Sequence, residues 1–129
     1  MILLDTDVCI AFLNGKEPTL QRLFSTAGDE LRLCAVVKAE LNFGARSSEK
    51  VSENLLRLRP FFAAIDSLDF DDAAAEQYWV IRAQLKRAGT PIGPNDLLIA
   101  SIALAHDASL ATRNVREFAR VPALRLEPI

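Results

Sequence analysis

Histidine and cysteine are scarce in this sequence: of 129 residues, one is a histidine (His106) and two are cysteines (Cys9 and Cys34). Both cysteines lie among apolar residues, which argues against a disulfide scaffold and favours a reducing compartment. A single histidine makes a His-rich metal site or a Ser-His-Asp triad hard to assemble. We expect His106 to lie near the end of a helix, as a cation for the helix carbonyls.

Long apolar runs are also absent. No run reaches the roughly 18 residues that a membrane-spanning helix needs, and residues 1–5 lack the basic region and the cleavage site of a signal peptide. These absences predict a cytoplasmic protein without membrane contact. Hydrophobic residues make up 50% of the chain and charged residues 25%, which is the balance of a globular protein, and the length suits one domain over residues 1–129.

Positive charge is in slight deficit, with fifteen Lys and Arg against seventeen Asp and Glu and a net charge of −2. This balance argues against nucleic-acid binding by bulk charge, which requires clustered cations. A local basic rim stays possible because eleven of the fifteen cations are arginine, the side chain best suited to bidentate contacts with phosphate or carboxylate.

Short apolar strands alternate with helices along the chain. Strands are expected at 2–4, 31–33, 65–68, 109–112 and 124–126. Helices are expected at 8–13, 18–24, 35–45, 48–62, 72–87 and 96–106, with one helical turn in the loop 113–119. This alternation predicts an α/β sandwich around a mainly parallel central sheet.

A carboxylate, Asp5, ends the first apolar strand. In open α/β sheets, ligands bind outside the carboxyl ends of the strands. Either Asp5 or Asp7 can cap the helix expected from Val8, and capping needs only one of them. We assign the cap mainly to Asp7, which leaves Asp5 for function.

Glu40 lies in a helical segment. Its neighbours one turn away are apolar or small: Val36, Val37, Phe43 and Gly44. If these residues define the buried face, Glu40 points inward. A buried carboxylate without a partner is costly, and the cost is removed by either a buried arginine or a metal cation.

Asp96 follows Gly93-Pro94-Asn95 and precedes an apolar helix. An acid in a first helical turn gains about 0.3–1 kcal/mol from the helix dipole. Asn95 is the better N-cap residue, which leaves Asp96 directed at another group.

Asp5, Glu40 and Asp96 come from three distant segments that a parallel sheet can bring to one edge. Carboxylates without histidine or cysteine suit a hard divalent cation, Mg²⁺ or Mn²⁺. Such ions orient a water for attack and neutralise charge on phosphate oxygens. The residues therefore indicate a metal-dependent phosphoryl or phosphodiester enzyme, and their spacing does not distinguish the two.

Four sequence blocks occur in order over essentially the whole chain. They are Ile2-Leu3-Leu4-Asp5-Thr6-Asp7, Val37-Lys38-Ala39-Glu40-Leu41, residues 89–100 (GTPIGPNDLLIA) and residues 110–118 (LATRNVREF), the last followed by Val121-Pro122. Together they resemble the PIN-domain ribonucleases, specifically the VapC-type toxins of bacterial type II toxin–antitoxin systems.

The resemblance implies a single PIN domain, a three-layer α/β/α sandwich whose acidic pocket binds Mg²⁺ or Mn²⁺ and hydrolyses RNA phosphodiester bonds. Asp5, Glu40 and Asp96 match the three best-defined acids of the family. Relatives often carry Asp where this chain has Asn114, which can coordinate through its carbonyl oxygen. Glu117 is the nearby remaining carboxylate, and we leave open which of the two takes the fourth position.

Further residues surround these acids. Thr6 and Asn95 are expected to hold the carboxylates in place. Thr112 either orients the attacking water or a ligand or simply ends its strand. Arg113 and Arg116 are expected to hold the RNA backbone, which offsets the negative charge of the chain locally.

The toxin resemblance also implies partners. A cytosolic ribonuclease needs a co-expressed inhibitor, so we expect a VapB-type antitoxin, bound in a groove between helices 18–24 and 51–62. We also expect a homodimer or a higher toxin–antitoxin assembly. Its interface would use helix 72–87, with Tyr78, Trp79 and Ile81 as candidate anchors.

Other interpretations remain. Asp5-Thr6-Asp7-Val8 fits the opening motif of haloacid-dehalogenase-type phosphatases, in which the first Asp accepts the phosphoryl group. A non-catalytic domain that binds Mg²⁺ or a protein would explain an acidic pocket, but not the nearby Arg113, Arg116 and Arg120. Asn114 adds the possibility of a degenerate nuclease retained for binding.

Overall fold

The centre of the molecule is a four-stranded sheet in the order β3-β2-β1-β4, in which every neighbouring pair is parallel. The computed structural model describes residues 1–129. The strands are β1 (Ile2–Leu4), β2 (Leu31–Cys34), β3 (Ser67–Leu68) and β4 (Ser109–Ala111). All of β1 is buried, as expected for a strand covered on both faces. The predicted parallel sheet is confirmed.

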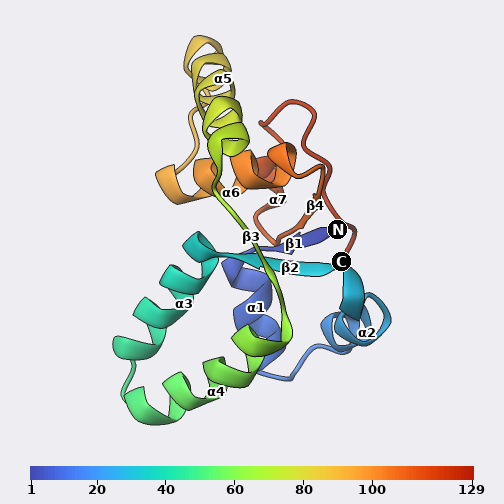
Figure 1. Ribbon diagram of the computed structural model, residues 1–129, viewed down its shortest axis with the longest axis vertical. Coiled ribbons are helices and arrows are strands. Elements are labelled where there is room, and N and C mark those ends of the chain that lie inside the picture. The colour runs from blue at the N-terminus through green and yellow to red at the C-terminus, as the bar shows by residue number, and fades with distance from the viewer.

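Helices cover both faces of the sheet (Figure 1). On one face lie α1 (Thr6–Leu13), α2 (Pro18–Thr26), α3 (Ala35–Arg46) and α4 (Val51–Ala64). On the other face lie α5 (Asp72–Ala88), α6 (Pro94–Ala105) and the short α7 (Val115–Phe118). A 3₁₀ turn, Gly28–Glu30, precedes β2. The expected three-layer α/β/α sandwich is thus confirmed.

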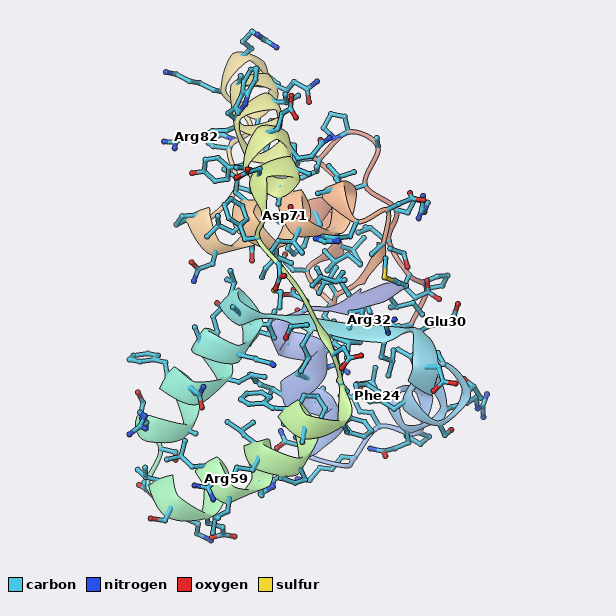
Figure 2. The ribbon with its side chains drawn as sticks, viewed as in Figure 1. Phe24, Glu30, Arg32, Arg59, Asp71 and Arg82 are labelled. Carbon is cyan, nitrogen blue, oxygen red and sulfur yellow. The ribbon has the colours of Figure 1, made fainter.

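An aromatic cluster packs the first helical layer. The rings of Phe12 and Phe24 stack with their centroids 3.6 Å apart, and Phe61 lies 6.0 and 6.1 Å from them. Phe24 lies in the space enclosed by α1, α2 and α4 (Figure 2). Leu20 of α2 is also buried. The groove expected between helices 18–24 and 51–62 is therefore filled by core side chains.

In the second layer, α6 is apolar on most sides and packs between the sheet and α5. Ile99 and Ala100 are completely buried, and Ser101 donates its hydroxyl to the Leu97 carbonyl oxygen at 2.6 Å. This hydrogen bond satisfies the only buried polar side chain of the helix. No helix of the chain combines the length and the apolar character that crossing a membrane requires.

His106 ends α6, where the sequence places it, but it does not bind the carbonyls of its own helix. Its Nε2 lies 2.9 Å from the Asp69 carbonyl oxygen and 3.6 Å from the Asp71 carboxylate. Asp71 caps α5 by accepting the Ala74 backbone N–H. His106 therefore ties the end of α6 to the start of α5.

Two strand predictions need correction at the ends. The predicted strand 124–126 is wrong: only one parallel bridge forms, between Leu110 and Leu126. Ala123 has a φ of 65°, which turns the chain just before the segment and leaves few extended residues to pair. The strand expected at 65–68 is reduced to Ser67–Leu68.

Candidate active site

Asp5 lies where β1 ends and α1 begins, and it is only 5% exposed. Its carboxylate accepts the backbone N–H of Thr6 at 2.8 Å and the Thr112 hydroxyl at 2.6 Å. Its own backbone N–H donates to the Ala111 carbonyl oxygen at 2.9 Å, which continues the β1–β4 pairing. Asp5 is thereby held by both its own helix and the neighbouring strand.

The assignment of the α1 cap to Asp7 is wrong, because Asp5 occupies the N-cap position and α1 starts at Thr6 instead of Val8. Asp7 instead accepts the backbone N–H of Arg113, at 3.3 and 3.2 Å from its two oxygens. Asp7 is not needed as the cap because the loop after β4 provides it with another donor, the Arg113 backbone N–H.

Thr112 follows β4 and is 1% exposed. Its hydroxyl donates to Asp5 and accepts the Asn114 backbone N–H at 3.0 Å. Because the one hydroxyl hydrogen is directed to Asp5, Thr112 here orients a carboxylate and not a water.

Glu40 reaches the same edge of the sheet from α3. Its Oε1 accepts the Thr6 hydroxyl at 2.6 Å, and its Oε2 lies 3.5 Å from the Asn95 amide nitrogen. The predicted buried face of this helix is wrong, since Phe43 is 73% exposed and Gly44 is also exposed. The helix buries Val37 and other residues spaced four apart, so Glu40 lies beside the core and is half-buried.

Asp96 lies in the first turn of α6. Asn95 is not the N-cap as predicted: the helix starts at Pro94, and Gly93 precedes it without any side-chain cap. Proline is favoured at the first helical position because it has no N–H to satisfy. The Gly93 N–H instead donates to Glu117 Oε1 at 2.7 Å.

Glu117, on α7, is the carboxylate beside Asp96: its Oε1 and Asp96 Oδ2 both lie within 4 Å of where a Cβ on Gly93 would stand. Asn114 stands behind Glu117, and its side-chain amide donates to Glu117 Oε2 at 2.8 Å. In this structure Asn114 acts as a hydrogen-bond donor to the acid, and Glu117 occupies the place next to Asp96.

The pKa values reflect burial and crowding. Burial raises the pKa of Asp5 to about 6, opposed by the Thr112 hydrogen bond and assisted by the charge of Asp7. Burial, followed by the charges of Asp5 and Glu117, raises the pKa of Asp96 to about 7. The hydrogen bonds from Gly93 and Asn114 lower the pKa of Glu117. The proton of the Asp96–Glu117 pair therefore belongs to Asp96.

No cation forms an ion pair with this group. The ion pairs of the chain join His106 to Asp71, Arg113 to Glu17 and Arg125 to Asp107. None of them includes one of the four carboxylates gathered here, Asp5, Glu40, Asp96 and Glu117. Carboxylates that approach one another without a cation must either protonate or bind one.

The donor chemistry fits a hard divalent cation, although no three carboxylates converge on one point. Glu40 is directed toward Thr6, and Glu117 toward Gly93 and Asn114. Mg²⁺ does not need a closed protein cage, since it retains several waters and is commonly bound through one or two carboxylates. Asp5 and Asp96 satisfy that requirement.

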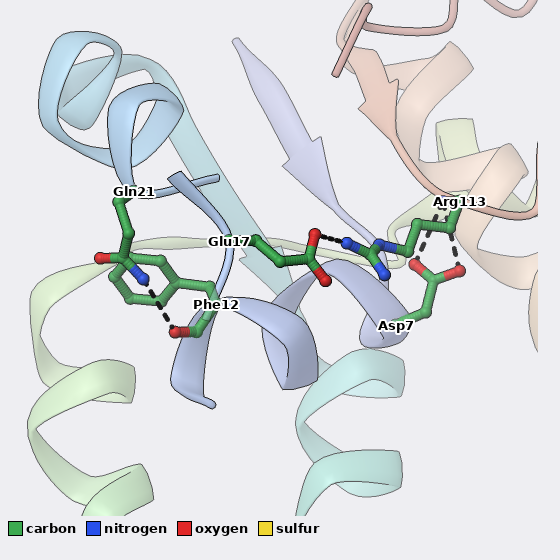
Figure 3. Close-up of polar contacts among 5 residues, drawn as sticks. All are labelled: Asp7, Phe12, Glu17, Gln21 and Arg113. Atoms are coloured by element: carbon green, nitrogen blue, oxygen red, sulfur yellow. Dashed lines mark hydrogen bonds and ion pairs between the residues drawn. The ribbon is translucent and has the colours of Figure 1, made fainter. Parts of the chain in front are cut away.

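The two predicted RNA-binding arginines have different surroundings. Arg113 forms an ion pair with Glu17, and its backbone N–H donates to Asp7 (Figure 3). Arg116 is exposed on α7 and forms no ion pair. No local sequence pattern indicates the Glu17–Arg113 pair, because the two residues come from distant segments of the chain.

Known proteins resemble this chain throughout. The PIN domain family model matches residues 2–124. The tRNA(fMet)-specific endonuclease VapC of Shigella flexneri is 38% identical over 97% of this chain and 95% of its own length. Ribonuclease VapC2 of Rickettsia felis is 36% identical over the same shares. A DNA-bound VapBC structure from Salmonella typhimurium is 34% identical with a TM-score of 0.93, covering 98% of this chain and 96% of that one.

Proposed function

This chain belongs to the PIN-domain family, and from that membership we propose that it is a VapC-type endoribonuclease that hydrolyses RNA phosphodiester bonds with Mg²⁺ or Mn²⁺. Four carboxylates without a cation, carried by β1, α3, α6 and α7 to one sheet edge, are the observation that supports this proposal. The phosphatase and binding-module alternatives have no comparable support among the relatives.

Asp5 and Asp96 would hold the cation, with Glu40 and Glu117 adding negative charge beside it. When bound, the cation supplies an activated water and neutralises phosphate oxygens. Thr112 and Thr6 keep the Asp5 carboxylate in one orientation. Thr6 also directs Glu40, and Asn114 directs Glu117, so Asp5, Glu40 and Glu117 each have a hydrogen-bond donor.

We propose tRNA(fMet) as the first substrate to test. The relatives from Shigella flexneri and Salmonella typhimurium, 38% and 34% identical, are named tRNA(fMet)-specific endonucleases. Sequence-specific RNA enzymes read unpaired bases in loops, and the half-exposed Asp96 leaves such a loop access to the site.

We further propose that a VapB-type antitoxin binds this chain. The solved neighbours from Salmonella typhimurium and Rickettsia felis are VapBC complexes, at TM-scores of 0.93 and 0.89. An apolar groove of about 250 Å³ runs between α1, α3 and α4 and reaches Glu40. Its apolar lining is Ile10, Leu13, Leu41, Ala45 and Leu58. A partner helix in this groove would place its end at the carboxylates.

A homodimer through α5 is part of the proposal. Trp79 is 62% exposed on this helix, and Val80 and Phe70 beside it are exposed too. Ile81, predicted as an anchor, is buried within the chain and is unsuitable for contact with a partner. Trp79→Ala should convert a dimer to a monomer in light scattering, while an unchanged mass would remove α5 from the interface.

The central experiment is cleavage of a tRNA(fMet) transcript. We expect Mg²⁺ or Mn²⁺ to support cutting and EDTA to stop it. Asp5→Asn and Asp96→Asn should each lower the rate by roughly 10²–10⁴-fold, the range lost when a positioned charged group is removed from an active site. Asp29→Asn changes an exposed acid in the turn before β2, at the opposite edge of the sheet from the site, and is the matched control that should cut normally.

Cation binding can be measured without cleavage. Mg²⁺ should raise the melting temperature of the wild-type chain, because a ligand that binds only the folded state stabilises it. The increase should disappear in Asp5→Asn and persist in Asp29→Asn. Wild-type cutting rates in both active-site variants would show that the site is assigned wrongly. Normal growth of a bacterial host that expresses abundant soluble chain alone would contradict the toxin proposal.

A further inference from the structure

The ion pair between Arg113 and Glu17 lies at the rim of the carboxylate site. The Arg113 and Glu17 side chains are 45% and 39% exposed, so both remain open to solvent. Arg113 directly follows Thr112, whose hydroxyl binds Asp5. The backbone that carries the Arg113 guanidinium is therefore fixed one residue away from the hydrogen bond between Thr112 and Asp5.

The backbone position of Arg113 is well determined. Its N–H donates to both oxygens of Asp7, at 3.3 and 3.2 Å, as Figure 3 shows. Asp7 is in the first turn of α1, two residues after the Asp5 cap. Only the guanidinium end is free to change partners, since the main chain of Arg113 is held by α1.

The Glu17 side chain has no polar partner other than Arg113. It occupies the N-cap position of α2, but its side chain caps nothing. It precedes Pro18, and the residue before a proline is restricted to extended conformations, in agreement with its φ of −124° and ψ of 104°. This extended backbone is followed by a helix whose first turn lacks an acid, and the carboxylate points across to Arg113 instead (Figure 3).

The pair lines a surface hollow together with a second cationic side chain, Lys16. Asp7, Lys16, Glu17 and Arg113 are its charged lining residues. Lys16 is exposed and forms no ion pair. Without the Glu17 charge, this hollow would present two cations against Asp7 alone, which suits a phosphate group.

We propose that Glu17 is an internal competitor for the RNA backbone: its carboxylate occupies Arg113 in the RNA-free protein and is displaced by a phosphate of the bound RNA. This inference rests on the proposed function, because it assigns a phosphate contact to the same site. The exchange is feasible since exposed ion pairs contribute little stability. Removing the Glu17 charge should therefore tighten RNA binding, by about 2–5-fold for a pair of that strength.

The test is a double-mutant cycle on RNA affinity. A fluorescent tRNA(fMet) transcript is titrated in EDTA, so that no cleavage occurs, against wild type, Glu17→Gln, Arg113→Ala and the double variant. We expect Glu17→Gln to tighten binding, and Arg113→Ala to weaken it and reduce the salt slope by about one. In the Arg113→Ala background, Glu17→Gln should have no effect. Glu76→Gln, an exposed acid on α5 without an ion pair, is the matched control.

Several outcomes would overturn the inference. If Glu17→Gln binds RNA as well as or more weakly than wild type, whatever its melting temperature, the Glu17–Arg113 pair has only a structural role. A tightening that persists in Arg113→Ala would be general charge repulsion. If the cycle holds while the Mg²⁺-supplemented wild type cuts no RNA, the phosphate exchange stands and the ribonuclease proposal fails. If the wild type cuts RNA but Glu17→Gln does not change RNA affinity, the ribonuclease proposal stands and the phosphate exchange fails. If no variant binds RNA, both proposals are rejected.

Discussion

Asp5 and the Asp96–Glu117 pair lie at the same edge of the sheet, but they are held in different ways. Asp5 is buried between the ends of β1 and β4 and has two hydrogen-bond donors from those elements. Asp96 and Glu117 are half-buried on α6 and α7, and their pKa values shift in opposite directions, that of Asp96 upward and that of Glu117 downward. Core packing therefore determines the first position, whereas the second depends on polar contacts that can change when a ligand arrives.

The first prediction separates the two acids by stability. The pKa of Asp5 is raised from 3.8 to about 6, so in the metal-free protein its contribution to stability is complete below about pH 4 and is lost as the pH rises through 6. Asp5→Asn removes the buried charge and keeps a residue suited to capping. We expect it to raise the free energy of unfolding by roughly 2–3 kcal/mol at about pH 8, with little change at about pH 3.

Urea unfolding in EDTA measures this effect. Asp96→Asn should show the same direction with a smaller gain, because Asp96 is more exposed than Asp5 and solvent lowers the cost of its charge. The comparison fails if Asp5→Asn is less stable than wild type at about pH 8, since Asp5 would then be stabilised as an ion.

A second prediction compares the two threonines that donate to carboxylates. Thr112→Val leaves Asp5 Oδ2 and the Asn114 N–H without a buried partner, which should cost about 1–3 kcal/mol. Thr6→Val removes the donor to Glu40 in a half-buried place, with an expected loss of about 0.5–1.5 kcal/mol.

The pKa of Asp5 supplies a second measurement for the same variants. The Thr112 hydrogen bond lowers that pKa, so it should increase in Thr112→Val when followed by carboxyl NMR. An equal loss of stability in both variants, with no change in the Asp5 pKa, would contradict the distinction between the buried Asp5 and the half-buried Glu40.

The third prediction concerns the hydrogen bonds to Glu117 in the Asp96–Glu117 pair, and its expected effect is the smallest. Asn114→Ala removes one of the donors that lower the pKa of Glu117, so that pKa should increase, with a stability loss of about 0.5–1 kcal/mol. Gly93→Ala is the matched variant. A Cβ there would lie 3.6 Å from Glu117 Oε1 and 3.9 Å from Asp96 Oδ2, an ordinary contact, and the backbone donor is kept.

Gly93→Ala should therefore stay within about 0.5 kcal/mol of wild type. NMR titration and urea unfolding of both variants give the measurement. A larger loss in Gly93→Ala than in Asn114→Ala would show that space around the carboxyl pair matters more than its hydrogen bonds.

Much of this protein was predictable from local sequence patterns. The strands at 2–4 and 31–33 and the helix at 72–87 agree with the structure to within one residue at either end. Such elements follow from the spacing of apolar residues, which depends only on neighbours along the chain. The sequence also marks Asp5, Glu40 and Asp96 as candidates, because a carboxylate beside an apolar run is unusual, and their assignment as site residues stays a prediction.

What required the tertiary structure was the partner of each polar group. Asp5 rather than Asp7 caps α1 because β4 brings Thr112 and the Arg113 N–H beside them, from more than 100 residues away. Glu117 lies next to Asp96 because the loop before α6 offers it the Gly93 N–H. Periodicity records which side chains are buried, whereas a hydrogen bond between distant segments depends on the strand order, which no local pattern contains.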